Sequence, residues 1–451
     1  MTPPSGDSAV SVESAVKAFV YGFAPVFNLS QVQRFVTTGV GANAAAPFNS
    51  FSHAANLAGP EDTFVSINND TVYSMAQLDL SVGPLLLSVP DTSDAYFVLQ
   101  FVDAWTNNFA YIGKRATGTF AGIYVLVPPG WPGELPPDAT AVHCSTTIVS
   151  IVGRWACDGV DDLPRVQKLQ DQTVLTPLGI SDPEGLPEPD PAVPEDLLFW
   201  EQLRIYLQAF PPAPRDVALQ QAFAPLGLLE SGKSPYANAD PDLAKILVEG
   251  AAQGRAAVEE ALKSGADSAV VNGWHQAFHI FDYNDDFFEI GTIDSPEWRI
   301  SDRAKAIGVR AAAAMGGLWG NHGYEAAYSQ IYTDSDGDQL SGDHSYTITF
   351  APTPPVDAFW SITMYSMPHF YLVSNPIGRY SIGDRTPGLV YSDDGSLTLT
   401  LSATEPSDPA TRANWLPTPT GAFRPLLRMY IPDQAVLDGS YEMPPIIKSD
   451  G

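Results

Sequence analysis

Cysteine is scarce in this sequence, which contains only Cys144 and Cys157 among its 451 residues. Two cysteines are too few for a disulfide framework or for a zinc site built from cysteine alone. A disulfide between them stays open for an exported chain. Since free cysteine is usually buried, we expect two buried free thiols.

Long apolar runs and an excess of positive charge are also missing. No run of about 18 apolar residues could span a bilayer, and residues 1–8 lack the basic segment and apolar core of a secretory signal. Lys and Arg number 23 against 52 Asp and Glu, a formal net charge of −29. Because Lys and Arg contact nucleic acid and anionic membranes, we expect neither partner. We expect a cytoplasmic protein; an exported mature form and a homo-oligomer stay open.

The sequence motifs of several enzyme classes are absent. There is no Gly-x-Ser-x-Gly elbow, no phosphate-binding P-loop and no Gly-x-Gly-x-x-Gly after a predicted strand. Serine hydrolases, kinases and dinucleotide oxidoreductases are therefore poor interpretations. No motif requires a cofactor, and the sequence identifies none.

Proline and glycine are abundant, with 40 and 36 residues, which indicates many turns and short strands. Short β-rich segments bounded by Pro, Gly or Asp follow one another between about residues 63 and 153, and again from 346 to about 445. In the first region they are Leu85–Val89, Tyr96–Val102, Gly122–Val127 and Thr146–Val152. Such regular spacing predicts β-sandwich or jelly-roll domains.

Helical patterns occupy the N-terminus and the middle of the chain. Apolar residues recur at helical spacing from residue 8 to about 34, where Pro25 is expected to break or kink the helix. Further helices are predicted at 194–207, 216–229, 241–263 and 299–317, after a proline-rich connection. The predicted fold class is α+β, mainly β. Its parts are an N-terminal helix and loop (1–59), a first β-sandwich domain (60–180), a connection and helical block (181–339) and a second β-sandwich domain (340–451).

The two β regions contain an internal sequence repeat. Tyr96–Phe101 followed by Ile112–Gly118 resembles Phe359–Met364 followed by Ile382–Gly388, and both end in Ile-Gly-x-Arg-x-x-Gly. The next strands, Ile123–Val127 and Leu389–Tyr391, are also expected to correspond. Repetition in the same order predicts two related β-domains separated by the helical block.

Several longer segments carry a resemblance to a known family. They are Asn68–Ser74, Val102–Asn108, Ile112–Arg115, Pro355–Tyr365, Asp393–Ser396 and Asn414–Pro417. Over nearly its whole length the chain resembles the paired bacterial proteins of domain-of-unknown-function families DUF1254 (N-terminal) and DUF1214 (C-terminal). The resemblance implies β-sandwich or jelly-roll domains with helices between and around them. It supplies no catalytic residue.

Polar residues crowd at the ends of predicted core strands, where they are costly unless paired with each other or with a ligand. We predict Asp70 and Asp103 as general acid and base, with Tyr73 and Arg115 in support. The predicted substrate contacts are Asn69, Trp105, Asn107, Tyr365 and Trp415.

These residues also have structural interpretations. Asn69 and Asp70 suit an Asx-turn between two strands, and Arg115 suits an ion pair with Asp70 or Asp103. For Trp415 the structural interpretation is a side chain that packs in the hydrophobic core.

Two segments have spacings compatible with a metal. His275 and His279 would share one face of a helix, but a zinc-peptidase glutamate is lacking, and half-exposed histidines are the expectation. Asp334–Asp343 resembles a calcium loop, yet Gly337 stands at its fourth position and Ser345 at its twelfth, so we expect a polar hairpin. A calcium site of a type other than the EF-hand stays open. We assign no metal.

Two functions follow as hypotheses. One is a metal-independent hydrolase or lyase that acts on a polar small molecule or glycan in a carboxylate-lined pocket. The other is a non-catalytic jelly-roll protein that binds a glycan or a protein partner. A carboxylate with a perturbed pKa in a closed cavity would favour the enzyme.

Overall fold

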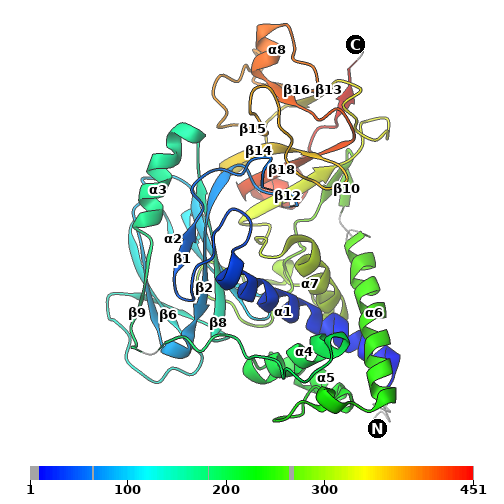
Figure 1. Ribbon diagram of the computed structural model, residues 1–451. Helices are drawn as coiled ribbons and strands as arrows, with labels where there is room; N and C mark the ends of the chain where they lie inside the picture. The colour runs from blue at the N-terminus through cyan, green and yellow to red at the C-terminus, as the bar shows by residue number, and fades with distance from the viewer. Residues whose placement is uncertain (1–9, 63–64, 181, 264–268, 450–451) are drawn as a thin grey trace.

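The protein is described from a computed structural model that covers residues 10–62, 65–180, 182–263 and 269–449. The fold class is α+β, with two β-sandwich domains, an N-terminal helix and a helical middle block. In Figure 1 the first sandwich lies on the left, the second at the top, and most helices at the lower right. No helix among these residues is long and apolar enough to cross a membrane.

The first sandwich stacks a five-stranded sheet on a four-stranded sheet. The larger sheet has the order β1 (Phe51–His53), β2 (Thr71–Asp79), β8 (Ile148–Ala156), β4 (Phe97–Asp103), β5 (Asn108–Gly113). The smaller has the order β7 (Thr140–His143), β6 (Gly122–Val127), β3 (Leu85–Val89), β9 (Val174–Pro177). Leu87, Phe101 and Trp155 belong to the core between them, as alternating strand patterns predict.

The second sandwich has a six-stranded and a four-stranded sheet. The larger has the order β10 (Ala269–Val271), β11 (Trp274–Gln276), β12 (Ala326–Ile331), β18 (Phe423–Pro432), β14 (Val356–Ser366), β15 (Ser381–Gly383). The smaller has the order β17 (Trp415–Pro417), β16 (Leu397–Ser402), β13 (Tyr346–Phe350), β19 (Ile447–Lys448). Strands β10 to β12 come from the segment that the sequence analysis assigned to the helical block.

The two sandwiches share one strand connectivity, so the prediction of two related β-domains is confirmed. Adding ten to each strand number converts the sheet orders of the first sandwich into those of the second, apart from the extra strand β10. Each smaller sheet contains one parallel pair, β6 with β7 and β16 with β17. The counterpart of β6 is thus β16, and the predicted match with Leu389–Tyr391 is wrong because that segment is a loop.

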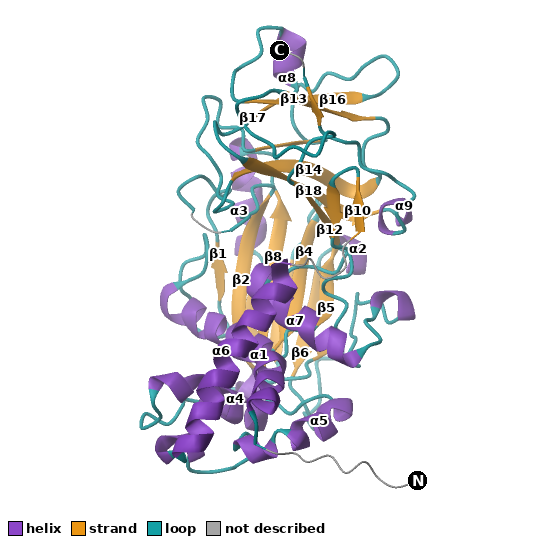
Figure 2. Ribbon diagram, turned by 90° about the vertical axis from the view of Figure 1, so that its right-hand side faces the viewer, coloured by secondary structure: helices purple, strands orange, loops and turns teal. Residues whose placement is uncertain are grey.

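The helices cover the face of the five-stranded sheet opposite the four-stranded sheet (Figure 2). They are α1 (Val12–Thr38), α4 (Leu198–Ala209), α5 (Val217–Ala222), α6 (Pro241–Lys263) and α7 (Arg303–Gly317), while α2 (Lys114–Thr117), α3 (Leu163–Asp171), α8 (Pro409–Ala413) and α9 (Gln434–Leu437) are short. Helix α1 continues through Pro25, so a break there is wrong. Residue 8, its predicted start, lies outside the described residues.

Candidate functional site

The strand register separates the two carboxylates that were predicted to act together. Thr71, which follows Asp70, pairs with Ala156 on β8, whereas Asp103 pairs with Val149 on the same strand. Seven residues of β8 span roughly 23 Å at about 3.3 Å per residue. The carboxyl groups of glycosidases lie about 5 to 9.5 Å apart. The predicted Asp70–Asp103 pair is therefore wrong.

Asp103 is held by hydrogen bonds from residues close to it at the end of β4. Its Oδ1 accepts from the backbone N–H groups of Trp105 at 2.9 Å and Asn107 at 2.8 Å. Its Oδ2 accepts from Asn107 Nδ2 at 2.8 Å and Ser145 Oγ at 2.6 Å. Burial raises the pKa of the carboxyl, and the bonds from Ser145 and Asn107 oppose that rise. The geometry is a side-chain-capped turn that ends β4.

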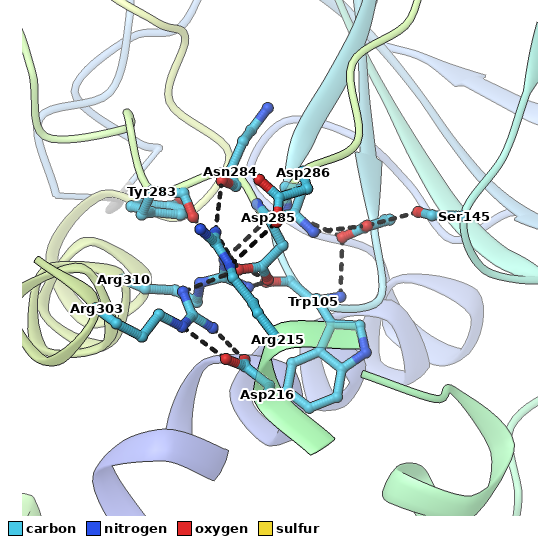
Figure 3. Close-up of polar contacts among 12 residues, drawn as sticks. Trp105, Ser145, Arg215, Asp216, Tyr283, Asn284, Asp285, Asp286, Arg303 and Arg310 are labelled. Atoms are coloured by element: carbon cyan, nitrogen blue, oxygen red, sulfur yellow. Dashed lines mark hydrogen bonds and ion pairs between the residues drawn. The ribbon is translucent and has the colours of Figure 1, made fainter. Parts of the chain in front are cut away.

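The same corner is tied to the helical block through Arg310, which the sequence analysis missed. Arg310 donates to four acceptors, the backbone oxygens of Trp105 and Tyr283, Asn107 Oδ1 and Asp285 Oδ2. Arg303 and Arg215 also pair with Asp285, at 2.8 and 3.0 Å (Figure 3). Burial alone would raise the pKa of Asp285, but Arg310 and Arg303 hold it below its ordinary value. Asp103, Trp105 and Asn107 thus belong to a network that joins sheet and helices.

Asp70 lies in a second place, the junction between the two sandwiches. Its Oδ2 accepts from Ser361 Oγ of β14 at 2.5 Å, and Arg428 Nη1 of β18 is 4.0 Å away. Its backbone N–H donates to Asn68 Oδ1 at 2.6 Å, and its backbone oxygen accepts from Arg385 Nη2 at 2.9 Å. The Asx-turn predicted for this corner therefore carries a carboxylate that contacts the other domain.

Three other predicted residues lie at the same junction. Tyr73 Oη accepts from Arg154 Nε at 3.3 Å. Tyr365 Oη accepts from Arg428 Nη2 at 2.8 Å and donates to a backbone oxygen of the first domain. Asn69 Oδ1 accepts from Ser381 Oγ of the second domain at 3.3 Å. The structure thus brings Asn69, Asp70, Tyr73 and Tyr365 to one interface.

Three buried arginines complete this interface, and sequence reasoning missed all of them. They are Arg154, Arg424 and Arg428, and each is at most 5% exposed. Arg154 donates to Gln100 Oε1 at 2.8 Å and to the backbone oxygen of Trp319 at 2.8 Å. The available signal was a charged residue inside an otherwise apolar strand, since such residues are almost never fully buried without a partner.

The other two arginines also have mainly neutral acceptors. Arg428 donates to Thr363 Oγ1 at 2.8 Å and to the backbone oxygen of Ser66 at 2.9 Å. Arg424 donates to Gln330 Oε1 at 2.9 Å and to Ser66 Oγ at 2.5 Å. The Nε of Arg424 is buried without a hydrogen-bond partner, and its guanidinium lies over the ring of Phe370.

We call Arg154, Arg424 and Arg428, with Asp70, Tyr73 and Tyr365, the junction cluster. Among the described residues no ion pair includes Arg154 or Arg424, and Arg428 has only the distant Asp70. Burial and the neighbouring Arg428 lower the pKa of Arg424, although Tyr332 and Tyr365 oppose this. The cluster therefore holds three buried guanidinium groups and one carboxylate, and only Arg428 lies within 4.0 Å of that carboxylate.

Two predicted site residues belong to neither the network around Arg310 nor the junction cluster. Arg115 pairs with Glu325 at 2.5 Å, so the predicted ion pair with Asp70 or Asp103 is wrong. Trp415 is buried on β17 of the second sandwich, where its Nε1 donates to the backbone oxygen of Ser402 at 2.9 Å. This geometry matches its structural interpretation as a core residue.

The metal-compatible spacings do not produce a metal site. His275 lies on β11 and His279 in the following turn, so the predicted helix is wrong; His279 Nδ1 contacts Asp282 Oδ2 at 2.6 Å. Asp334 Oδ1 accepts from two backbone N–H groups of its own turn. No group of three His, Cys, Asp or Glu side chains in the described part of the chain is arranged to hold a metal ion. Both cysteines are free and buried.

Comparison with known proteins assigns each sandwich to a family. A family described as protein of unknown function (DUF1254) matches residues 48–177, and protein of unknown function (DUF1214) matches residues 325–434. The crystal structure of the VPA0106 protein from Vibrio parahaemolyticus is similar, with 24% identity over 97% of this chain and 100% of that chain and a TM-score of 0.72. An uncharacterised protein from Burkholderia cenocepacia has 12% identity over 97% and 94% of the two chains and a TM-score of 0.45. No curated protein matches the sequence.

Proposed function

We propose a binding function for this chain, which belongs to the family of proteins with a DUF1254 domain followed by a DUF1214 domain. The proposed ligand is a small polar anion, and the proposed site is the junction cluster between the sandwiches. The observation that carries this proposal is the imbalance of three buried guanidiniums against the single carboxylate of Asp70.

The physical argument concerns charge and not hydrogen bonding alone. The neutral oxygens around Arg154 and Arg424 satisfy N–H donors, but they do not balance a buried positive charge, which costs several kcal/mol when it stands alone. Carboxylates and phosphates fit the planar donor fork of a guanidinium. The unpartnered Nε of Arg424 lies next to the Nη2 that contacts Ser66, so this arginine retains a donor for such a group.

This proposal follows the second of the two hypotheses drawn from the sequence, with a change of ligand. The hydrolase or lyase relied on Asp70 and Asp103 together, and the register places them at opposite ends of the sheet. A cluster dominated by arginine favours an anion over a neutral glycan. Two pockets of the described residues, one lined by Trp105 and the other by Arg379, include no cluster arginine.

The test measures thermal stability and intact mass with a panel of small anions. Acetate, succinate, citrate and inorganic phosphate would be added to wild-type protein, to Arg424→Gln and to the control Arg412→Gln. Arg412 is a half-exposed arginine whose partner is Glu405. An anion at 100 times its Kd stabilises the folded state by about 2.7 kcal/mol.

We expect at least one anion to raise the Tm of the wild type and of Arg412→Gln, and to raise the Tm of Arg424→Gln much less. Native mass spectrometry should show one bound anion per chain. A panel without any stabilising anion, or an equal Tm shift in Arg424→Gln, would overturn the proposal.

A further inference from the structure

The internal repeat defines which residues of the two sandwiches are equivalent. In the first sandwich, Gly113 of the repeated Ile-Gly-x-Arg motif lies opposite Val98. In the second sandwich, Gly383 of the same motif lies opposite Ser361. A Cβ on either glycine would lie 2.3 or 2.0 Å from a backbone oxygen of the facing strand. Both positions thus require glycine for the same steric reason, which fixes the alignment of the repeats.

This alignment places two cluster arginines at the same position. The residue of β8 opposite Val98 is Arg154, and the residue of β18 opposite Ser361 is Arg428. Arg154 belongs to the face of the five-stranded sheet that carries Tyr73, and Arg428 to the face of the six-stranded sheet that meets the first domain. The two arginines are equivalent residues of two facing repeats.

Each arginine also has an equivalent tyrosine beside it. Tyr73 of β2 is opposite Arg154, and Tyr328 of β12 is opposite Arg428. Tyr328 lies opposite Arg428 on the neighbouring strand; burial raises the pKa of its phenol, and the charges of Arg154 and Arg428 oppose that rise. The two tyrosine–arginine pairs therefore meet at the same interface.

The contacts that cross the interface are reciprocal. Arg115 is the arginine of the Ile-Gly-x-Arg motif in the first sandwich, and it donates to Glu325, the residue before β12. Arg385 is the arginine of the same motif in the second sandwich, and it donates to the backbone oxygen of Asp70, the residue before β2. Reciprocal contacts between equivalent surfaces are the property of a two-fold interface. The two sandwiches of this chain therefore pack against each other with approximate two-fold symmetry, as the subunits of a dimer do.

From this we infer that the ligand of the junction is a dianion, a small molecule with one anionic group at each end, and that each tyrosine–arginine pair binds one end. The inference rests on the proposed function and specifies its ligand. Two equivalent cationic positions on facing repeats present two sites for an anionic group, and guanidinium binds carboxylate and phosphate in the same geometry. The two pairs differ in charge, because Asp70 lies 4.0 Å from Arg428 whereas Arg154 forms no ion pair with the described residues. Arg154 therefore contributes more to the charge balance of the bound ligand.

The test is calorimetric titration of the full chain with malonate, succinate, glutarate and adipate, and with propionate and butyrate as singly charged controls. The wild type should bind one dicarboxylate at least about tenfold more tightly than either monocarboxylate, the change that one further charged contact produces. In Arg154→Gln this preference should disappear while weak binding of both classes remains. Arg412→Gln should keep the wild-type preference.

The outcomes separate the two proposals. Equal affinity of the wild type for dicarboxylates and monocarboxylates would overturn the dianion and leave anion binding intact, as would a preference retained in Arg154→Gln. Failure of every anion to bind the wild type would overturn both. Because the comparison of ligands on the wild type needs no variant, the inference is tested even if Arg154→Gln does not fold.

Discussion

Arg115 of the first sandwich and the buried Glu325 of the second form an ion pair across the domain junction, with an Nε to Oε2 distance of 2.5 Å. Glu325 is 1% exposed as a side chain, and Tyr96 Oη also donates to it, at 3.0 Å. The carboxylate depends on these donors because water does not reach it.

Arg115→Gln should therefore destabilise the whole chain. Removing one partner of a buried pair leaves the other charge uncompensated, which costs about 3 to 5 kcal/mol. Urea unfolding followed by fluorescence would measure the change. Arg412→Gln, which breaks a half-exposed pair, should change the free energy of unfolding by less than about 1 kcal/mol. Similar values for the two variants would contradict this role of Arg115.

Asp285→Asn should loosen the helical block from the first sandwich. Three arginines, Arg215, Arg303 and Arg310, pair with this carboxylate, which is 6% exposed. We expect a loss of about 3 to 5 kcal/mol, as for other broken buried pairs. The neighbouring Asp286 is 49% exposed, so Asp286→Asn is the matched control and should cost less than about 1 kcal/mol. Hydrogen exchange of α7 amides should rise in the first variant and not in the second.

Asp103→Asn should impair stability without affecting ligand binding. The amide nitrogen would meet donors from Asn107 or Ser145 where the carboxylate now accepts, and an unsatisfied buried bond costs about 1 to 3 kcal/mol. The junction cluster lies at the other end of the sheet, so the affinity for the anion should stay within about twofold of the wild type. Loss of anion affinity in a folded Asp103→Asn protein would contradict the assignment of Asp103 to a structural corner.

His279 should make stability depend on pH near neutrality. A hydrogen bond to Asp282 is the main cause that raises its pKa above 6.5, against the opposing effect of burial. Because the folded pKa is the higher one, this contribution is complete below pH 6.5 and disappears as the pH rises through the folded pKa. His279→Gln should remove that part of the pH dependence, measured as the difference in unfolding free energy from wild type between pH 6 and pH 9.

His275→Gln serves as the control for this experiment, since His275 forms no ion pair in the described part of the chain. It should retain the wild-type pH profile. An unchanged profile in His279→Gln would show that the contact with Asp282 contributes nothing to stability.

Much of the fold was readable from local sequence. Strands bounded by proline and glycine, the helical middle block and the repeated Ile-Gly-x-Arg all depend on neighbouring residues. Trp274 shows the limit: its segment was predicted as a helix, but it pairs with Ile331 on β12, a partner 57 residues away in the sequence.

The sequence by itself determined the strands, the repeat and the polar residues that end the strands. Only the tertiary structure decided which of those residues meet. Asp70 precedes β2 and Asp103 is the last residue of β4, and both strands run antiparallel to β8. Two strands that are antiparallel to the same neighbour run in the same direction. The start of one strand and the end of the other therefore lie at opposite ends of the sheet. Strand direction, which no local pattern encodes, thus separated the two carboxylates and left Asp70 beside the arginines of the second domain.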